Sequence, residues 1–219
     1  MDTLHAWIAG ATGLVGAQLL DALLDDARYE TVVALGRRTL GRAHPRLAEA
    51  MFDFGAGTAP KDLPRADVAF CCLGTTIAKA GSQAAFRAVD HDAVLAFARA
   101  AQAAGATRFY VVTALGADPN ATVFYNRVKG ETENDLRALG FASLGIARPS
   151  LLLGDRTESR PGERAAIVAS RWFAPLLRPF AARPIEARDV AKALAAMARD
   201  AQAGVRVAEN AELFTLAGG

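Results

Sequence analysis

Short apolar runs alternate with longer helical segments along nearly the whole chain, and this order constrains the fold more than any other feature. The runs that read as strands lie at residues 5–9, 31–36, 51–54, 67–74, 108–116 and 143–154, the last with its exit loop. The segments that read as helices lie at 14–26, 82–104 and 124–140. Parallel neighbouring strands need long crossovers, which are usually helices. The sequence therefore predicts an α/β protein with a doubly wound parallel sheet.

The part of the chain after the sixth strand is too short to form an independent substrate domain. A helix is expected at 184–201 and a short final strand at 205–217. We therefore expect a single domain over residues 1–219, with a cofactor-binding part at about 1–150 and a small C-terminal cap at about 151–219.

Composition excludes several classes of protein. The chain has 219 residues, of which 52% are hydrophobic, and this suffices for one domain with a sizeable core. A formal net charge of +2 argues against a dedicated nucleic-acid binder. The three histidines show no metal-ligand spacing, so no metal is expected.

The expected location is cytoplasmic. Cys71 and Cys72 are adjacent inside an apolar run, where they read as small buried strand residues and form no disulfide framework. The apolar stretch 4–20 is interrupted by glycines, and no Lys or Arg precedes it. Neither a signal peptide nor a stable membrane insertion is therefore expected.

The segment GATGLVG, residues 10–16, stands between the first strand and the first helix. In that place Gly10 permits the tight turn, Gly13 lets backbone amides approach a pyrophosphate, and Gly16 lets the helix pack closely on the strand. The helix N-terminus adds amide donors and a partial positive charge. We interpret the turn as a dinucleotide site, since a plain strand–helix turn needs only one of the three glycines. Its other expected cofactor-binding residues are Thr12, Leu14 and Val15.

The end of the second strand indicates which dinucleotide would bind. A site for NAD usually has an acid there, but this chain has Arg37 and Arg38. A guanidinium suits a phosphate through charge-assisted hydrogen bonds, so NADP (NADPH) is expected in preference to NAD. The alternative is a pair of solvated arginines. Asp53 follows the third strand and could accept from the adenine amino group, or it could be an ordinary loop acid.

Tyr125 and Lys129 lie four residues apart in a predicted helix, which puts both side chains on one face. A phenol is a poor acid–base catalyst at its usual pKa of about 10, and a nearby ammonium favours the phenolate. Thr113 ends the preceding strand and could supply a hydroxyl that orients a substrate carbonyl. The alternative is an interfacial Tyr beside an exposed Lys.

Five motifs occur in order over nearly the whole chain: GATGLVG, CCLGTT, VVTALGAD, FYNRVKGETE and RPSLLLGDRTESR. Together they resemble an atypical short-chain dehydrogenase/reductase of the Tat-interacting-protein-like oxidoreductase group, with a Rossmann fold. The resemblance implies that Tyr125 exchanges a proton with the substrate oxygen. It also implies that Lys129 binds the nicotinamide ribose and that Thr113 takes the place of an assisting serine, although its methyl group crowds the pocket. The remaining cofactor contacts that it implies are Leu73, Gly74, Thr75 and, near the nicotinamide, Pro149.

Two later segments have open interpretations. Residues 154–164 carry Arg156 and Arg160. This segment is either a solvated loop, or its two arginines bind an anionic substrate. Residues 165–182 could form an amphipathic helix over a substrate pocket, or an interface for a homodimer or a protein partner. A helix that lies on a membrane surface is the third alternative.

The sequence therefore favours an NADP-dependent oxidoreductase that acts on a carbonyl or hydroxyl of an unidentified small molecule. Two alternatives remain open at this point. One is a non-catalytic module that senses NADP(H) and presents its cap to a protein. The other is a flavin or quinone reductase, which needs no phenolic proton donor.

Overall fold

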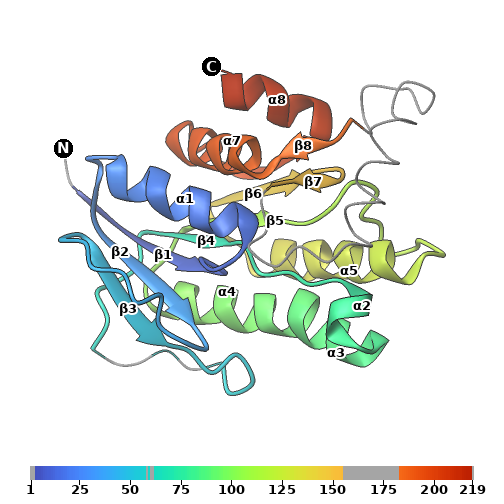
Figure 1. Cartoon of the computed structure of the whole chain (residues 1–219), viewed down its shortest axis with the longest axis horizontal. Helices are drawn as coiled ribbons and strands as arrows, with labels where there is room; N and C mark the ends of the chain where they lie inside the picture. Colours follow the sequence, from blue (N-terminus) through green and yellow to red (C-terminus); the bar gives the residue numbers. More distant parts are fainter. Residues whose placement is uncertain (1–2, 58, 60–61, 155–182, 219) are drawn as a thin grey trace.

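The computed structural model describes residues 3–57, 59, 62–154 and 183–218. One parallel sheet runs through these residues in the strand order β3-β2-β1-β4-β5-β6-β9 (Figure 1). Its strands are β1 (Leu4–Ala9), β2 (Tyr29–Gly36), β3 (Leu47–Met51), β4 (Val68–Cys71), β5 (Arg108–Val112), β6 (Ser143–Arg148) and β9 (Gly204–Glu209). A separate parallel pair joins β7 (Leu152–Leu153) to β8 (Ile185–Glu186). The doubly wound parallel sheet is thus confirmed.

Helices cover both faces of the sheet. On one face lie α1 (Leu14–Asp25), α7 (Ala187–Arg199) and α8 (Asn210–Gly218), and on the other lie α4 (Ala93–Ala103) and α5 (Phe124–Ala138) (Figure 1). Two short helices, α2 (Ile77–Ala80) and α3 (Gln83–Arg87), precede α4, and a π-helical turn at Ala88–Asp92 joins α3 to α4. Among the described helices, none is long and apolar enough to cross a membrane.

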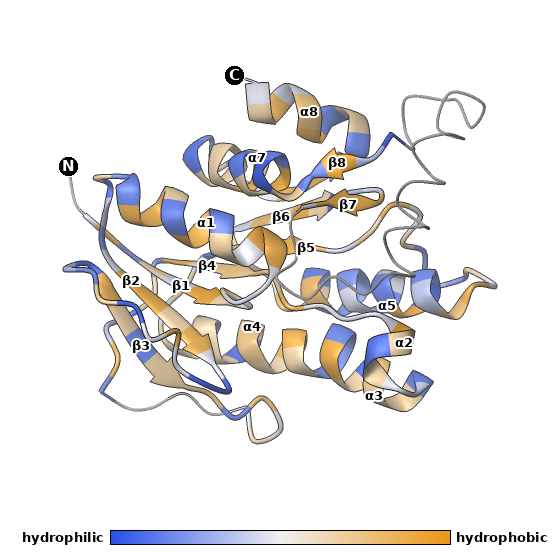
Figure 2. Cartoon of the chain, in the orientation of Figure 1, coloured by the Kyte–Doolittle hydropathy of each residue, from blue (hydrophilic) through white to orange (hydrophobic). Residues whose placement is uncertain are grey.

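The core has two parts, one on each face of the sheet. Successive side chains of a strand point to opposite faces. On β1, Ala6 and Ile8 pack into the cluster beneath α1 and α7, whereas Trp7 and Ala9 pack into the cluster against α4. The central strands are therefore apolar on both sides. Figure 2 shows β1 and β2 largely in hydrophobic colours, whereas α1, α5 and α7 carry both hydrophilic and hydrophobic residues.

Several expected boundaries are wrong. The strands expected at 67–74 and 108–116 end earlier, at Cys71 and Val112. The third strand is Leu47–Met51 and not 51–54, because it is an edge strand with half-buried residues and lacks a continuous apolar run. The helix expected at 82–104 is interrupted by the π-helical turn. The final strand ends at Glu209, and the rest of that segment forms α8, which packs on α7.

Candidate functional site

The glycine turn lies at the carboxyl end of β1. Gly10 has a φ of +83°, and a Cβ there would lie 2.5 Å from the carbonyl carbon of Cys72. A Cβ on Gly16 would lie 2.1 Å from the Gly10 carbonyl oxygen, so the close approach of helix and turn needs a glycine. A Cβ on Gly13 would meet the same oxygen at 3.3 Å, which is tight but can be relieved by a small shift. Two of the glycines are therefore required by the fold itself.

The N-terminus of α1 suits an anion. Gly13 is its N-cap and provides no side-chain hydrogen bond, and the first turn carries no acidic residue. Thr12 and Gly13 are exposed, Leu14 is half-buried, and Val15 is buried. The first amides of a helix lack partners within the helix and attract negative charge. The residues present therefore fit the pyrophosphate of a dinucleotide.

The loop after β2 carries Arg37 and Arg38, and both are exposed. Within the described residues, neither makes a hydrogen bond or an ion pair. Asp53 is also exposed, and its Oδ1 accepts the N–H groups of Gly55 at 2.8 Å and Ala56 at 3.3 Å. One oxygen of this acid is thus occupied by a turn of its own loop.

Lys129 on α5 is buried and forms an ion pair with Asp90, with 2.7 Å between Nζ and Oδ1. The π-helical turn places Asp90 there, and such turns are frequent at functional sites. Burial alone would lower the pKa of Lys129, but the Asp90 carboxylate, together with Tyr125 and Cys71, outweighs burial, and the pKa is raised above its ordinary 10.5. Lys129 is therefore held as an ammonium.

The same aspartate contacts the loop after β4. Asp90 Oδ2 accepts the backbone N–H of Thr75 at 2.9 Å. A Cβ on Gly74 would lie 3.5 Å from Asp90 Oδ1 and 3.9 Å from Lys129 Nζ. Leu73, which starts this loop, also adjoins the glycine turn, because its amide nitrogen would lie 2.8 Å from a Cβ on Gly10. The loop 73–75 thus connects the glycine turn to the buried ion pair.

Tyr125 lies one turn before Lys129 and is half-buried. Its ring packs on Phe86, with 5.3 Å between the centroids. In the described part of the chain its hydroxyl makes no hydrogen bond, so nothing there competes with a substrate for it. The helix therefore presents the phenol and the ammonium on consecutive turns of one face, as their spacing predicted.

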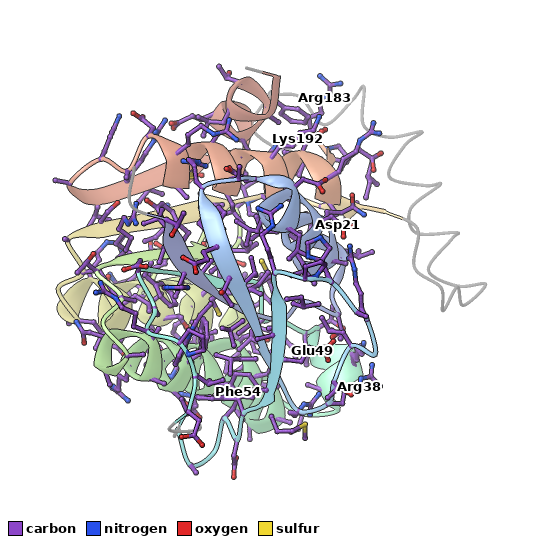
Figure 3. All side chains as sticks on the ribbon, turned by 90° about the vertical axis from the view of Figure 1, so that its left-hand side faces the viewer. Asp21, Arg38, Glu49, Phe54, Arg183 and Lys192 are labelled. Carbon is purple, nitrogen blue, oxygen red and sulfur yellow. The ribbon has the colours of Figure 1, made fainter. Side chains whose placement is uncertain are left out.

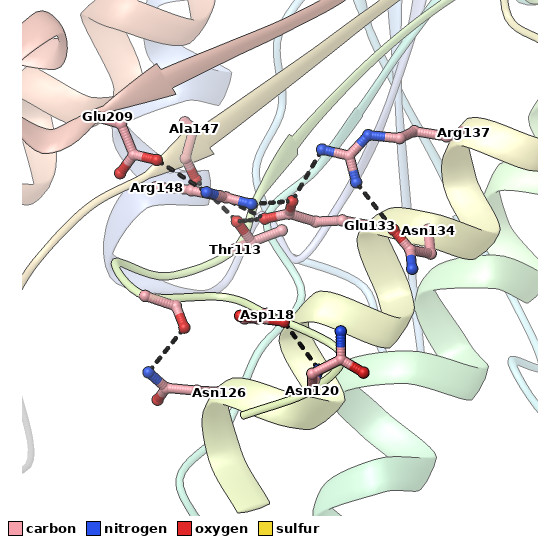
Figure 4. A network of polar contacts seen from close by, with 11 residues as sticks. Thr113, Asp118, Asn120, Asn126, Glu133, Asn134, Arg137, Ala147, Arg148 and Glu209 are labelled. Atoms are coloured by element: carbon pink, nitrogen blue, oxygen red, sulfur yellow. Dashed lines mark hydrogen bonds and ion pairs between the residues drawn. The ribbon is translucent and has the colours of Figure 1, made fainter. Parts of the chain in front are cut away.

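Thr113 directly follows β5, as the sequence predicted, but its hydroxyl already has a partner within the protein. Its side chain is buried, and its hydroxyl donates to Glu133 Oε1 at 2.8 Å (Figure 4). Glu133 is fully buried and also accepts two hydrogen bonds from Arg148. Arg148 Nε donates to Oε1 at 2.9 Å, and Nη2 donates to Oε2 at 2.6 Å. The hydroxyl of Thr113 is thus engaged within the protein, which favours a structural role. Its assignment as an assisting hydroxyl stays a prediction.

The segment after β6 is tied to the neighbouring loop. Pro149 is buried, and its carbonyl accepts the N–H of Leu115 at 2.8 Å. The guanidinium of Arg148 bridges Glu133 to Glu209 on β9, and the hydrogen bond to Glu133 raises its pKa. Arg156, Arg160 and the segment 165–182 lie outside the described residues.

Sequence reasoning missed both buried carboxylates of this region. Asp90 stands in FRAVDHD and Glu133 in KGETEND, and each looks like an ordinary acid of a polar helix. A usable signal existed for Glu133, since Tyr125, Lys129 and Glu133 recur every four residues and so share one helix face. The partner of Lys129 lies on a different helix and depends on the π-helical turn, which no local pattern indicated.

The parallel sheet, the glycine turn and the Tyr125–Lys129 helix define an atypical short-chain dehydrogenase/reductase with a Rossmann fold. No family model matches the sequence. The chain is 34% identical over 218 residues to protein FMP52 of Eremothecium gossypii, with 97% of each chain covered. It is 39% identical over 168 residues to protein HTATIP2 of Rattus norvegicus, covering 74% of this chain and 69% of the rat protein. The chain belongs to the family that contains FMP52 and HTATIP2.

Solved structures share the fold. A short-chain dehydrogenase from Burkholderia cenocepacia in complex with NADP aligns with a TM-score of 0.67 at 17% identity, covering 100% of this chain and 92% of that one. MoeE5 in complex with UDP-glucuronic acid and NAD aligns with a TM-score of 0.68 at 22% identity, covering 93% and 75%. The fold is thus that of NAD(P)-dependent oxidoreductases and epimerases. Its bound examples include both NAD and NADP, so the fold does not discriminate between them.

The expected cytoplasmic location is contradicted. The relatives from Eremothecium gossypii, Candida albicans and Emericella nidulans are all named as mitochondrial proteins. Cysteine usage reports only on redox conditions, and it does not distinguish one reducing compartment from another.

Proposed function

We propose that the protein is an NADP(H)-dependent oxidoreductase that acts on a carbonyl or hydroxyl group, with Tyr125 as its acid–base residue. The observation that carries this proposal is the position of Lys129. It is buried one turn from Tyr125, it is charge-balanced by Asp90, and it adjoins Gly74. A protein that only binds a dinucleotide has no need for a buried ammonium beside a free phenol.

Each part of the cofactor has residues that suit it. The α1 N-terminus would hold the pyrophosphate, and Leu73, Gly74 and Thr75 would line the central part. Lys129 would bind the nicotinamide ribose. Arg37 and Arg38, which have no partner among the described residues, would bind the 2′-phosphate and so favour NADP over NAD. When bound, the nicotinamide supplies or accepts the hydride.

Tyr125 moves the proton that accompanies the hydride. For reduction of a carbonyl, its hydroxyl donates a proton to the substrate oxygen, and the resulting phenolate is stabilised by the ammonium of Lys129. Oxidation of an alcohol uses the same atoms in reverse. Asp90 keeps Lys129 positively charged and in place, and so acts on the tyrosine through the lysine.

The test begins with binding of NADP and NAD to the parent protein by calorimetry. Oxidation of NADPH is then followed at 340 nm, the absorption band of the reduced nicotinamide, over panels of aldehydes, ketones and quinones. The proposal expects tighter binding of NADP and consumption of NADPH with at least one carbonyl compound. A sensor would bind NADP(H) and consume none, whereas a quinone or flavin reductase would turn over without needing Tyr125.

A further inference from the structure

The two arginines proposed for the 2′-phosphate lie at the start of the loop 37–46, which joins β2 to β3. Figure 3 labels Arg38 of this loop and Glu49 of β3. A loop of exposed arginines binds a phosphate well only if its backbone is already ordered, since ordering it on binding costs affinity. Neither arginine fixes the loop, because neither makes a hydrogen bond or an ion pair among the described residues. The ordering contacts therefore have to come from elsewhere.

Glu49 provides them from the middle of β3. Its Oε2 accepts the backbone N–H of Leu40 at 2.6 Å, and its Oε1 accepts the backbone N–H of Arg42 at 3.3 Å. Both amides belong to the loop, and Leu40 itself packs against the core cluster beneath α1. One half-buried carboxylate thus fixes the backbone a few residues beyond Arg38.

The same two hydrogen bonds also occupy Glu49. Each of its oxygens already accepts an amide N–H, and the carboxylate makes no ion pair with Arg37 or Arg38. A nearby acid that did pair with them would compete with the phosphate for the guanidinium groups. Glu49 orders the loop and leaves the two arginines available.

The far side of the loop is fixed independently. Arg42 forms an ion pair with Asp21 on α1. Arg46 donates to the carbonyl oxygens of Leu24, Asp26 and Tyr29 around the C-terminus of α1, at 2.9 Å for Asp26 and 3.2 Å for Tyr29. Loss of Glu49 would therefore loosen the part of the loop next to the arginines without releasing its other end.

We infer that Glu49 is a positioning residue that sets the selectivity of the protein for NADP over NAD, acting through the backbone of the loop that carries Arg37 and Arg38. This inference rests on the proposed function, since it assumes that the two arginines bind the 2′-phosphate. It adds a specificity residue on β3 that never touches the cofactor.

The test measures dissociation constants for NADP and NAD by calorimetry in the parent and in Glu49→Gln. The amide keeps the size of the side chain but places an NH₂ group against one backbone N–H. Affinity for NADP should fall about tenfold, equivalent to roughly 1.4 kcal/mol, while affinity for NAD stays within about twofold. The matched control is Glu30→Gln, an exposed acid at the other end of β2, which should change neither constant.

A double-mutant cycle separates positioning from general stability. In a protein that already carries Arg37→Ala and Arg38→Ala, Glu49→Gln should cause no further loss of NADP affinity, because the residues that it positions are gone. The inference is overturned if Glu49→Gln lowers NADP and NAD affinity in parallel, leaves both unchanged, or strengthens NADP binding by removing a negative charge.

The same measurements distinguish failure of the proposed function from failure of the inference about Glu49. If the parent binds NADP and NAD equally, the assignment of the arginines is wrong and the inference falls with it. If the parent prefers NADP and Glu49→Gln keeps that preference, only the role of Glu49 is wrong. Should Glu49→Gln unfold, Glu49→Asp keeps the negative charge but shortens the side chain so that it no longer reaches both amides, and the same selective loss is expected.

Discussion

Lys129 Nζ lies 2.7 Å from Asp90 Oδ1, and the two side chains are only 5% and 1% exposed. A buried ammonium is unfavourable without a counter-charge, so Asp90 decides whether Lys129 can be charged at all. Because Asp90 also accepts the N–H of Thr75, the same carboxylate connects the lysine to the loop after β4. The stability of this region and its chemistry therefore depend on one pair.

Replacing Asp90 with Asn should lower the free energy of unfolding by about 3–5 kcal/mol, because it leaves a buried ammonium without its partner. Urea denaturation near neutral pH measures this change. Asp92→Asn is the matched control on the same π-helical turn, since its side chain is 62% exposed and its loss should cost about 1 kcal/mol or less. Equal midpoints for parent and Asp90→Asn would contradict the importance of the pair.

The pair also predicts a pH dependence at alkaline pH. The pKa of Lys129 is raised in the folded protein, so its stabilising contribution is complete below the ordinary value of 10.5 and is lost as pH rises through the raised value. Above pH 10.5 the free energy of unfolding should therefore fall more steeply for the parent than for Asp90→Asn. Denaturant titrations over that range compare the two slopes, and identical slopes would argue against the ion pair.

Alanine substitutions at Gly16 and Gly13 should have different effects, one on stability and the other on NADP binding. Gly16→Ala places a Cβ 2.1 Å from a backbone oxygen and should destabilise the fold by about 1–3 kcal/mol. Gly13→Ala meets that oxygen only at 3.3 Å, so the variant should fold, but its methyl group stands where a pyrophosphate would approach. Thermal unfolding and NADP calorimetry distinguish them. Normal NADP affinity in Gly13→Ala would contradict a close approach of the pyrophosphate to this glycine.

Thr113→Val distinguishes a structural role of the threonine from a catalytic one. Valine keeps the shape but removes the hydrogen bond to Glu133, so the free energy of unfolding should fall by about 1–3 kcal/mol. Turnover per folded molecule should stay within roughly threefold of the parent, because a lost catalytic hydroxyl would cost far more. Thr113→Ser should retain both properties. A large loss of turnover in a fully stable Thr113→Val would show instead that the threonine is a catalytic residue.

Much of the fold could be predicted because strand and helix patterns alternate and local patterns report on burial. The bounds of the edge strand β3 were not predicted, because its residues are half-buried. The helix α8 was not predicted, because it depends on tertiary packing on α7. In the site, the spacing of Tyr125 and Lys129 placed both on one helix face. The same spacing also places Glu133 on that face. The contacts of Asp90 with Lys129 and of Glu133 with Thr113 could not be predicted, because they depend on packing between separate elements.

The central claim is that Tyr125 passes a proton to the substrate oxygen, and Tyr125→Phe tests it most directly. Phenylalanine keeps the ring and its packing on Phe86 but removes the hydroxyl. With a carbonyl substrate found by the NADPH screen, turnover should fall by about 10²–10⁴-fold, while the dissociation constant for NADP stays close to that of the parent. Turnover of Tyr125→Phe within roughly threefold of the parent, on the same substrate and with normal NADP binding, would contradict the mechanism.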